Sequence, residues 1–111
     1  MKKEELIEKE VERLEKLFEK LPENRKGLAK RLIENASFMS VTLDELKVTI
    51  NKEGVKEKYK NGQNQYGYKD STEAKYYDKL ICNYSKVIKQ LNDMLPKDEP
   101  PVKADDFEEF E

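Results

Sequence analysis

The sequence predicts a mainly α protein whose three helices pack in a coiled-coil-like arrangement. A short β-hairpin between the second and third helix and a disordered acidic C-terminal tail complete the prediction. Three observations support this fold class. Apolar residues recur every three or four positions over three long stretches, a polar segment with glycines separates the second stretch from the third, and the chain closes on a proline-rich acidic segment. Of the 111 residues, 41% are charged and 36% hydrophobic, a composition typical of helices with one apolar and one solvated face.

The first helix is predicted over residues 4–21. Its apolar residues have the spacing 4, 3, 4, 3 that places them on one face: Ile7, Val11, Leu14, Phe18 and Leu21. Pro22 interrupts this helix because proline lacks the backbone N–H that a continuing helix needs. Proline also fits the first turn of a new helix, so the segment after Leu21 is interpreted as a corner between two helices.

The second helix is predicted over residues 23–53 and would extend about 45 Å if unbroken. Its apolar face consists of Leu28, Leu32, Ala36, Met39, Leu43, Leu46 and Ile50. Small and β-branched residues near its middle leave open a restart of the helix, with Thr42 and Glu45 forming a capping box. Gly54 is well placed as the glycine beyond its C-terminus.

The third helix is predicted over residues 71–95, with its N-cap supplied either by Asp70 together with Glu73 or by Ser71 alone. Pro96 ends it. Its apolar face again follows a 3, 4 spacing: Ala74, Tyr77, Ile81, Tyr84, Ile88, Leu91 and Leu95. The two tyrosines in this face are interpreted as packing residues with their hydroxyls at the edge, in preference to ligand contacts.

The polar segment between these helices contains Asn61-Gly62, the strongest short signal for a two-residue hairpin turn. Before the turn, Val55, Glu57 and Tyr59 would share one face of a strand, and after it Gln63, Gln65 and Gly67 alternate with Asn64, Tyr66 and Tyr68. This pattern favours a β-hairpin over about residues 55–68. A polar loop that carries tyrosines is the alternative. An isolated hairpin is marginally stable, so it would pack on the helices or on a neighbouring chain.

Composition excludes several kinds of chemistry. The chain has no histidine and a single cysteine, Cys82, which is interpreted as a part-buried helix residue. No phosphate-binding loop, metal-ligand cluster or paired nucleophile and base is present, so we expect no enzyme, no cofactor, no metal and no small-molecule substrate. No apolar run approaches the roughly 20 residues that span a bilayer, so we expect no membrane partner.

Charge is distributed unevenly along the chain. The whole chain carries −2 and residues 96–111 carry −5, so residues 1–95, the predicted helical domain, carry +3. The positive charge lies in two basic islands, "NRKGLAKR" and "KEKYKNGQNQYGYK", which are candidate contacts to nucleic acid or ordinary solvated surface. The candidate DNA-binding residues are Arg25, Lys26, Lys30, Arg31, Lys58, Lys60, Tyr66 and Tyr68.

The predicted tail, residues 96–111, is too polar to fold alone. Phe107 and Phe110 stand three positions apart among acidic residues, so both would share one face if the segment became helical on a partner. These two phenylalanines are the candidate partner-binding residues. The alternative is a tail that only increases solubility.

The segment "TINKEGVKEKYKNGQNQYGYKDSTEAKYYDKLICNYSKVIKQLNDMLP", residues 49–96, resembles the phage terminase small subunits, in particular the short helical kind from phages and prophages of Gram-positive bacteria. The resemblance lies in the order of helix, glycine, hairpin with "NG" at its tip, polar "NQY" segment and capped helix that ends in "LP". Related sequences commonly continue with a basic or serine-rich end, whereas this chain continues with an acidic one.

The resemblance implies a non-enzymatic DNA-packaging component in the cytoplasm of a bacterial host. It would form a homo-oligomer, contact double-stranded DNA and recruit the large terminase subunit. The apolar helix faces agree with subunit packing, although packing within one chain is the more common reason for such faces. The alternative function is a small phage-encoded regulator or inhibitor that binds a host or phage protein without binding DNA.

Overall fold

The computed structural model describes residues 2–60 and 66–102, and at positions 57, 59, 60, 66–68 and 70 it describes the backbone only. Its elements are α1 (Lys3–Leu17), α2 (Glu23–Glu53), β1 (Lys56–Lys60), β2 (Tyr66–Asp70) and α3 (Thr72–Asp93). The prediction of a mainly helical protein with three helices is confirmed. Among the described helices, none combines the length and the apolar character that crossing a bilayer requires.

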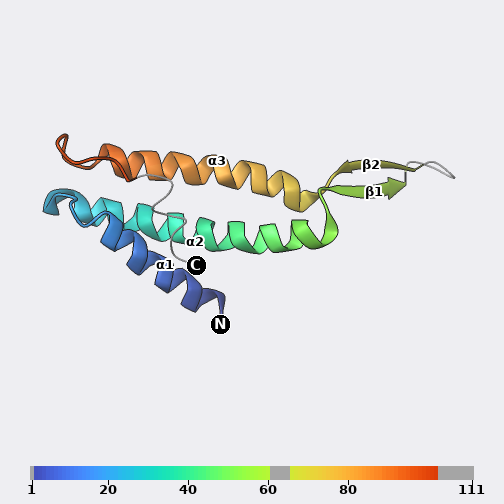
Figure 1. The fold of residues 1–111 in the computed structure, drawn as a ribbon, viewed down its shortest axis with the longest axis horizontal. Coiled ribbons are helices and arrows are strands. Elements are labelled where there is room, and N and C mark those ends of the chain that lie inside the picture. Colours follow the sequence, from blue (N-terminus) through green and yellow to red (C-terminus); the bar gives the residue numbers. More distant parts are fainter. Residues whose placement is uncertain (1, 61–65, 103–111) are drawn as a thin grey trace.

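The molecule is long and narrow, with extents of 62 × 30 × 23 Å. Figure 1 shows α2 and α3 side by side along the long axis, with the paired strands projecting beyond one end. α2 packs along both other helices. From the corner at Pro22, α1 runs back along α2 until Lys3, whose Nζ lies 2.9 Å from the Glu45 carboxylate. The last two turns of α2 therefore extend beyond α1.

The first helix is shorter than predicted. The expected range was 4–21, but α1 ends at Leu17 and the next residues form a tight turn. In this turn the Leu21 N–H donates to the Phe18 carbonyl at 3.2 Å. Phe18 and Leu21 are nevertheless buried, at 2% and 5% exposure, because the turn directs them into the same core as the helix. The apolar spacing predicted burial correctly and helix length incorrectly.

The second helix runs unbroken over the predicted range. No restart occurs at Thr42, where Val41, Thr42 and Leu43 are all buried in succession. A helix buried on more than one side is held by packing, which outweighs the weak helix preference of β-branched residues. Gly54 ends α2 as predicted, with a φ of 86° that favours glycine and an N–H that donates to the Ile50 carbonyl at 2.7 Å.

The third helix begins with the predicted cap. The Ser71 hydroxyl accepts a hydrogen bond from the Ala74 N–H at 3.0 Å, so the alternative with Ser71 alone as N-cap is confirmed. α3 ends at Asp93, two residues before the predicted end, although Leu95 remains buried. As at the end of α1, apolar residues continue past the last helical turn.

The main core lies at the corner end, where all three helices and the turns beside them contribute. Its residues are Leu14, Phe18, Leu21, Ala29, Ile33, Ala36, Leu91 and Leu95. Small residues on α2 face large ones on its neighbours, which lets the helices approach closely. At the other end of the molecule, Leu80 of α3 is buried as well.

The strands pair antiparallel, in a register that sets Lys56 opposite Asp70 and Lys60 opposite Tyr66. At the base of the ribbon the Ser71 N–H donates to the Val55 carbonyl at 2.8 Å. This bond holds the end of α2 close to the start of α3. The predicted turn at Asn61-Gly62 lies outside the described residues, so the closed hairpin stays a prediction.

The C-terminal segment differs from the expected tail over its first part. Residues 96–102 return along α3, and the Asn92 side chain binds the Val102 backbone twice. Val102 N–H donates to Asn92 Oδ1 at 2.8 Å, and Asn92 Nδ2 donates to the Val102 carbonyl at 3.3 Å. Val102 also packs against the main core. Residues 103–111 lie outside the described residues, and their predicted disorder stays a prediction.

Ser37 of α2 is fully buried, and its hydroxyl has no hydrogen-bond partner among the described residues. An unsatisfied buried hydroxyl costs about 1–3 kcal/mol. We therefore expect Ser37→Ala to raise the free energy of unfolding by about 1–2 kcal/mol, measured by urea denaturation followed by circular dichroism.

Ser85→Ala is the matched control, because Ser85 is exposed and its hydroxyl donates to the Ile81 carbonyl at 2.9 Å. Both substitutions gain about 0.5 kcal/mol from the higher helix propensity of alanine. Only Ser37→Ala also removes a buried hydroxyl that lacks a hydrogen bond, so it should be the more stable variant. A Ser37→Ala variant that is less stable than the wild type would contradict the expectation.

Candidate nucleic-acid interface

The basic residues at the start of α2 do not form one surface. The Arg25 guanidinium donates to the Met94 carbonyl at 2.7 Å, so it joins the start of α2 to the end of α3. Lys26 Nζ lies 3.2 Å from the Glu23 carboxylate. Lys30 and Arg31 are exposed, but consecutive helix residues diverge by about 100° and point to different sides. Lys26 and Lys30, four residues apart, share one side of α2 and line the same shallow hollow, whereas Arg31 lies on another side. This candidate cluster therefore contributes one structural contact, one pair of lysines and one separate arginine.

The register of the strands brings the other candidates together. Residues two apart share a face of a strand, and residues directly opposite in an antiparallel pair share it too. Lys58 is opposite Tyr68 and Lys60 is opposite Tyr66. All four candidate positions therefore fall on one face of the ribbon, and Lys56 falls on the same face.

The two groups of candidates lie at opposite ends of the molecule. Arg25 and Lys26 lie in the first turn of α2, at the corner, whereas the ribbon follows the last turn of that helix (Figure 1). A 31-residue helix is about 45 Å long, which exceeds the reach of any side chain. The two basic islands of the sequence are thus separate surfaces.

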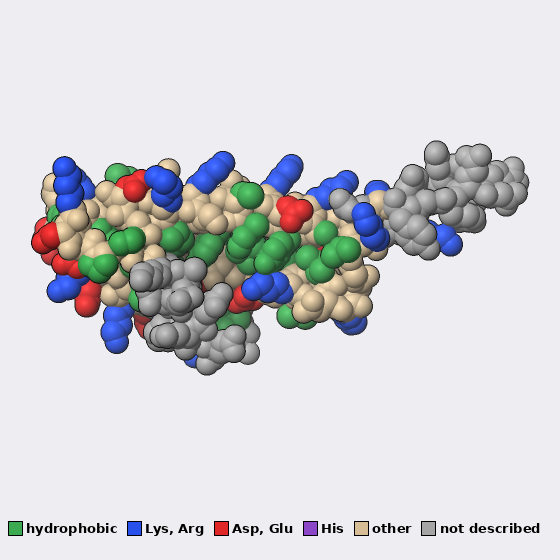
Figure 2. Space-filling model, turned by 45° about the horizontal axis from the view of Figure 1, so that its top comes forward, with side chains coloured by type: hydrophobic (Ala, Val, Ile, Leu, Met, Phe, Trp, Pro, Cys, Tyr) green, Lys and Arg blue, Asp and Glu red, His purple; other side chains and the backbone are tan. Residues whose placement is uncertain are grey.

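A third basic surface, on α3, was missed in the sequence analysis. The exposed residues Lys75, Lys79, Lys86 and Lys89 lie on the side of α3 opposite its apolar face, and we name them the α3 lysine face. Figure 2 shows a row of Lys and Arg side chains along the upper edge of the molecule. Lys89 Nζ lies 3.0 Å from the Asp93 carboxylate, whereas no ion pair involves the other three within the described residues. These four lysines are 4, 7 and 3 residues apart, and such intervals place residues on one side of a helix, so the sequence already contained the signal for this surface.

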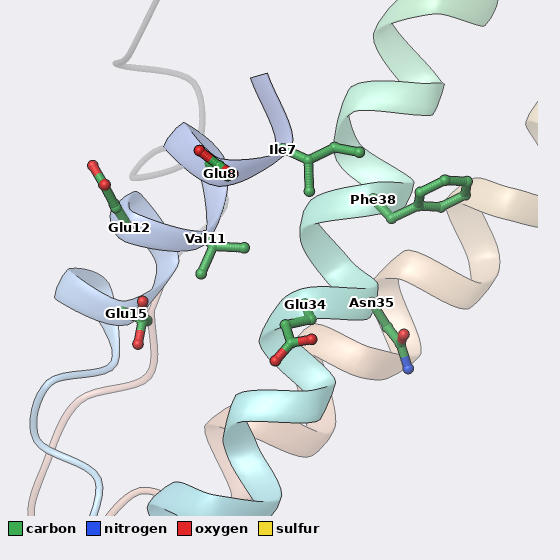
Figure 3. A pocket seen from close by; sticks show the side chains of 8 residues that line it. All are labelled: Ile7, Glu8, Val11, Glu12, Glu15, Glu34, Asn35 and Phe38. Atoms are coloured by element: carbon green, nitrogen blue, oxygen red, sulfur yellow. The ribbon is translucent and has the colours of Figure 1, made fainter. Parts of the chain in front are cut away.

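An acidic groove lies between α1 and α2, on the side away from α3. Its lining residues are Ile7, Glu8, Val11, Glu12, Glu15, Glu34, Asn35 and Phe38, and its volume is about 690 Å³. Figure 3 shows Ile7 and Val11 directed from α1 toward α2, and Glu34 directed back toward α1. Within the described part of the chain, none of the four carboxylates has an ion-pair partner. The groove therefore combines an apolar floor, formed by Ile7 and Val11, with an excess of carboxylates.

A polar cluster joins the three helices beside the core. The Arg13 guanidinium donates to both oxygens of Glu10, at 2.6 and 2.8 Å, and the Ser40 hydroxyl donates to Glu10 at 2.8 Å. The side chains of Glu10 and Arg13 are only 12% and 14% exposed. Tyr84 of α3 completes the cluster, and its pKa is raised to about 12 by burial and by the nearby Glu10 charge. Tyr84 thus packs in the interior with its hydroxyl toward polar groups.

The ionised form of Glu10 is favoured by its partners. Burial raises the pKa of Glu10, but hydrogen bonds from Arg13 and Ser40 and the Arg13 charge outweigh burial, so the pKa lies below its ordinary value. Arg13 is held in its charged form by the same contact, which raises its pKa. This cluster fixes how α1 sits on α2 and α3, and we assign it to structure.

The described residues contain neither of the candidate partner-binding phenylalanines and no cluster of metal ligands. Phe107 and Phe110 lie outside the described residues. In the portion of the chain that is described, no three His, Cys, Asp or Glu side chains converge as metal ligands do. Comparisons of the chain with protein-family models, with curated proteins and with solved structures found no match in any of the three.

The lowered pKa of Glu10 predicts how stability changes with pH. Ionised Glu10 stabilises the fold above its unfolded pKa of about 4.3, and this stabilisation is lost as the pH falls through the lower folded pKa. We expect Glu10→Gln to reduce the free energy of unfolding at pH 7 by about 1–3 kcal/mol. The variant should also lose less stability than the wild type between about pH 5 and pH 3.

Urea denaturation at several pH values measures both effects. Glu19→Gln is the control, since Glu19 is exposed and belongs neither to this cluster nor to the acidic groove, and it should lose stability on acidification in parallel with the wild type. If Glu10→Gln and the wild type lose stability in parallel on acidification, Glu10 does not act as described.

Proposed function

We propose that this protein is a non-enzymatic DNA-packaging component, similar to a terminase small subunit. It oligomerises, contacts double-stranded DNA and recruits the large terminase subunit. The proposal rests on the resemblance over residues 49–96 and on one observation from the structure. The ribbon places Lys56, Lys58, Lys60, Tyr66 and Tyr68 on one face at the far end of a long helical body.

That arrangement suits contact with a phosphate backbone. A projecting two-stranded ribbon is narrow enough to enter the major groove of DNA. Lysines supply point charges to phosphates, and tyrosine hydroxyls act as additional donors to the backbone. The contacts proposed here position DNA without reading base sequence.

The function without DNA binding is favoured by a different observation. The acidic groove between α1 and α2 offers partly exposed apolar area beside carboxylates that form no ion pair among the described residues, which suits a basic protein surface better than a nucleic acid. If the chain proves unable to bind DNA, a regulator that acts through this groove is the function that replaces our proposal.

The test compares variants at the two ends of the molecule. Lys58→Ala/Lys60→Ala removes two cations from the ribbon face. We expect it to bind a 30-base-pair duplex roughly ten-fold more weakly and to reduce the slope of log K against log salt by about 2. Fluorescence anisotropy across a salt series measures both quantities.

The matched control is Lys26→Ala/Lys30→Ala, which removes the same charge at the corner end of α2 and should bind close to the wild type. Equal weakening by both double variants would show that the ribbon is not the DNA contact. A wild-type protein that binds no duplex at about 50 mM salt would overturn the proposed function.

A further inference from the structure

The acidic groove between α1 and α2 has the character of an uncovered interface. Ile7 and Val11, which form its floor, are only partly buried. Phe38, at the edge of the groove, is 47% exposed, and Lys3 Nζ lies 4.6 Å from the centroid of its ring. Contiguous apolar area that stays partly exposed is typical of a contact surface. Glu8, Glu12, Glu15 and Glu34 lie along the groove and have no ion-pair partner among the described residues, with Glu8 and Glu12 directed outward (Figure 3). A basic surface complements this excess of carboxylates.

Charge excludes a symmetric contact of the groove with itself. A two-fold interface brings the same patch of both subunits together, so it would set the carboxylates of one groove against those of the other. Like charges at close range cost several kcal/mol. The residues 103–111 of the same chain, which carry five acids and one lysine, are unsuitable for the same reason.

The α3 lysine face has the complementary charge and spacing. Lys79 and Lys86 are seven residues apart on one helix, and Glu8 and Glu15 are seven residues apart on another. Each pair spans about 10.5 Å along its helix axis. The aliphatic stems of the lysines suit the apolar floor while their ammonium groups reach the carboxylates at the rim. Two acidic residues reduce the charge of the α3 lysine face: Asp78, beside it, and Asp93, which pairs with Lys89. Neither forms an ion pair with Lys79 or Lys86 among the described residues.

We propose that a second copy of this chain occupies the groove, with the α3 lysine face of one copy seated in the acidic groove of the next. The two surfaces lie on different sides of one molecule, since only α1 and α2 line the groove and α3 lies behind α2 in Figure 3. Such a contact is head-to-tail and repeats, giving a ring if the rotation closes and a filament if it does not. This inference rests on the oligomerisation in the proposed function, and its test uses no DNA.

Cys82, expected from the sequence to be part-buried, is instead exposed on the outer side of α3 between Lys79 and Lys86. It is the single cysteine of the chain, so it reports on this contact directly. In an antiparallel seating with Lys86 on Glu8 and Lys79 on Glu15, Cys82 lies opposite Glu12. We expect the full-length Glu12→Cys variant to form a ladder of disulfide-linked dimers, trimers and larger species under mild oxidation. Denaturing gels without reductant display the ladder.

Two controls make the ladder specific. The wild type has one thiol per chain and can form dimers at most. Lys9→Cys adds a thiol to the exposed side of α1 that does not line the groove, and it should also give no ladder. Circular dichroism of each variant establishes that the helices are intact.

Charge reversal tests the pairing itself. In the Glu12→Cys background, Lys79→Glu/Lys86→Glu should abolish the ladder, and the further addition of Glu8→Lys/Glu15→Lys should restore it. A Glu12→Cys variant that gives only dimers, or no linked species, overturns the inference. A ladder that survives the lysine reversal overturns it as well. Because these outcomes are independent of duplex binding, the inference and the DNA contact fail separately.

Discussion

The burial of α2 against two neighbours is the constraint on which the rest of the structure depends. This 31-residue helix packs along both α1 and α3, and the consecutive buried residues Val41, Thr42 and Leu43 show that more than one of its sides is covered. α1 and α3 each bury one face and leave the other in water. The polar cluster of Glu10, Arg13, Ser40 and Tyr84 then fixes the position of α1 beside the core.

The same arrangement separates the charges of the molecule. Carboxylates line the groove between α1 and α2, lysines line the outer side of α3, and the ribbon places further lysines at the far end. A chain with a formal net charge of only −2 thus presents surfaces of opposite sign in different directions. Surfaces of this kind favour oriented contacts over non-specific association, which is the physical basis of both proposals.

Sequence patterns predicted the helices better than the surfaces. Pro22, Gly54 and Ser71 act through local backbone chemistry, so the limits of α2 and the start of α3 were accessible from sequence. The end of α1 was predicted wrongly because Phe18 and Leu21 pack from a turn as well as they would from a helix. The groove depends on Phe38, which lies outside the apolar spacing of its helix. The separation of the two basic islands follows from the length of α2, which the predicted range of 23–53 already implied.

Hydrogen–deuterium exchange of the full-length protein, with and without a saturating DNA duplex, tests the central claim most directly, because it reports on every segment at once. The account predicts that DNA slows exchange in β1 and β2 while exchange in the first turn of α2 stays unchanged. It also predicts that raising the protein concentration without DNA slows exchange in α1 and on α3. Protection by DNA confined to the corner around Lys26, or exchange that is identical at all protein concentrations, would contradict it.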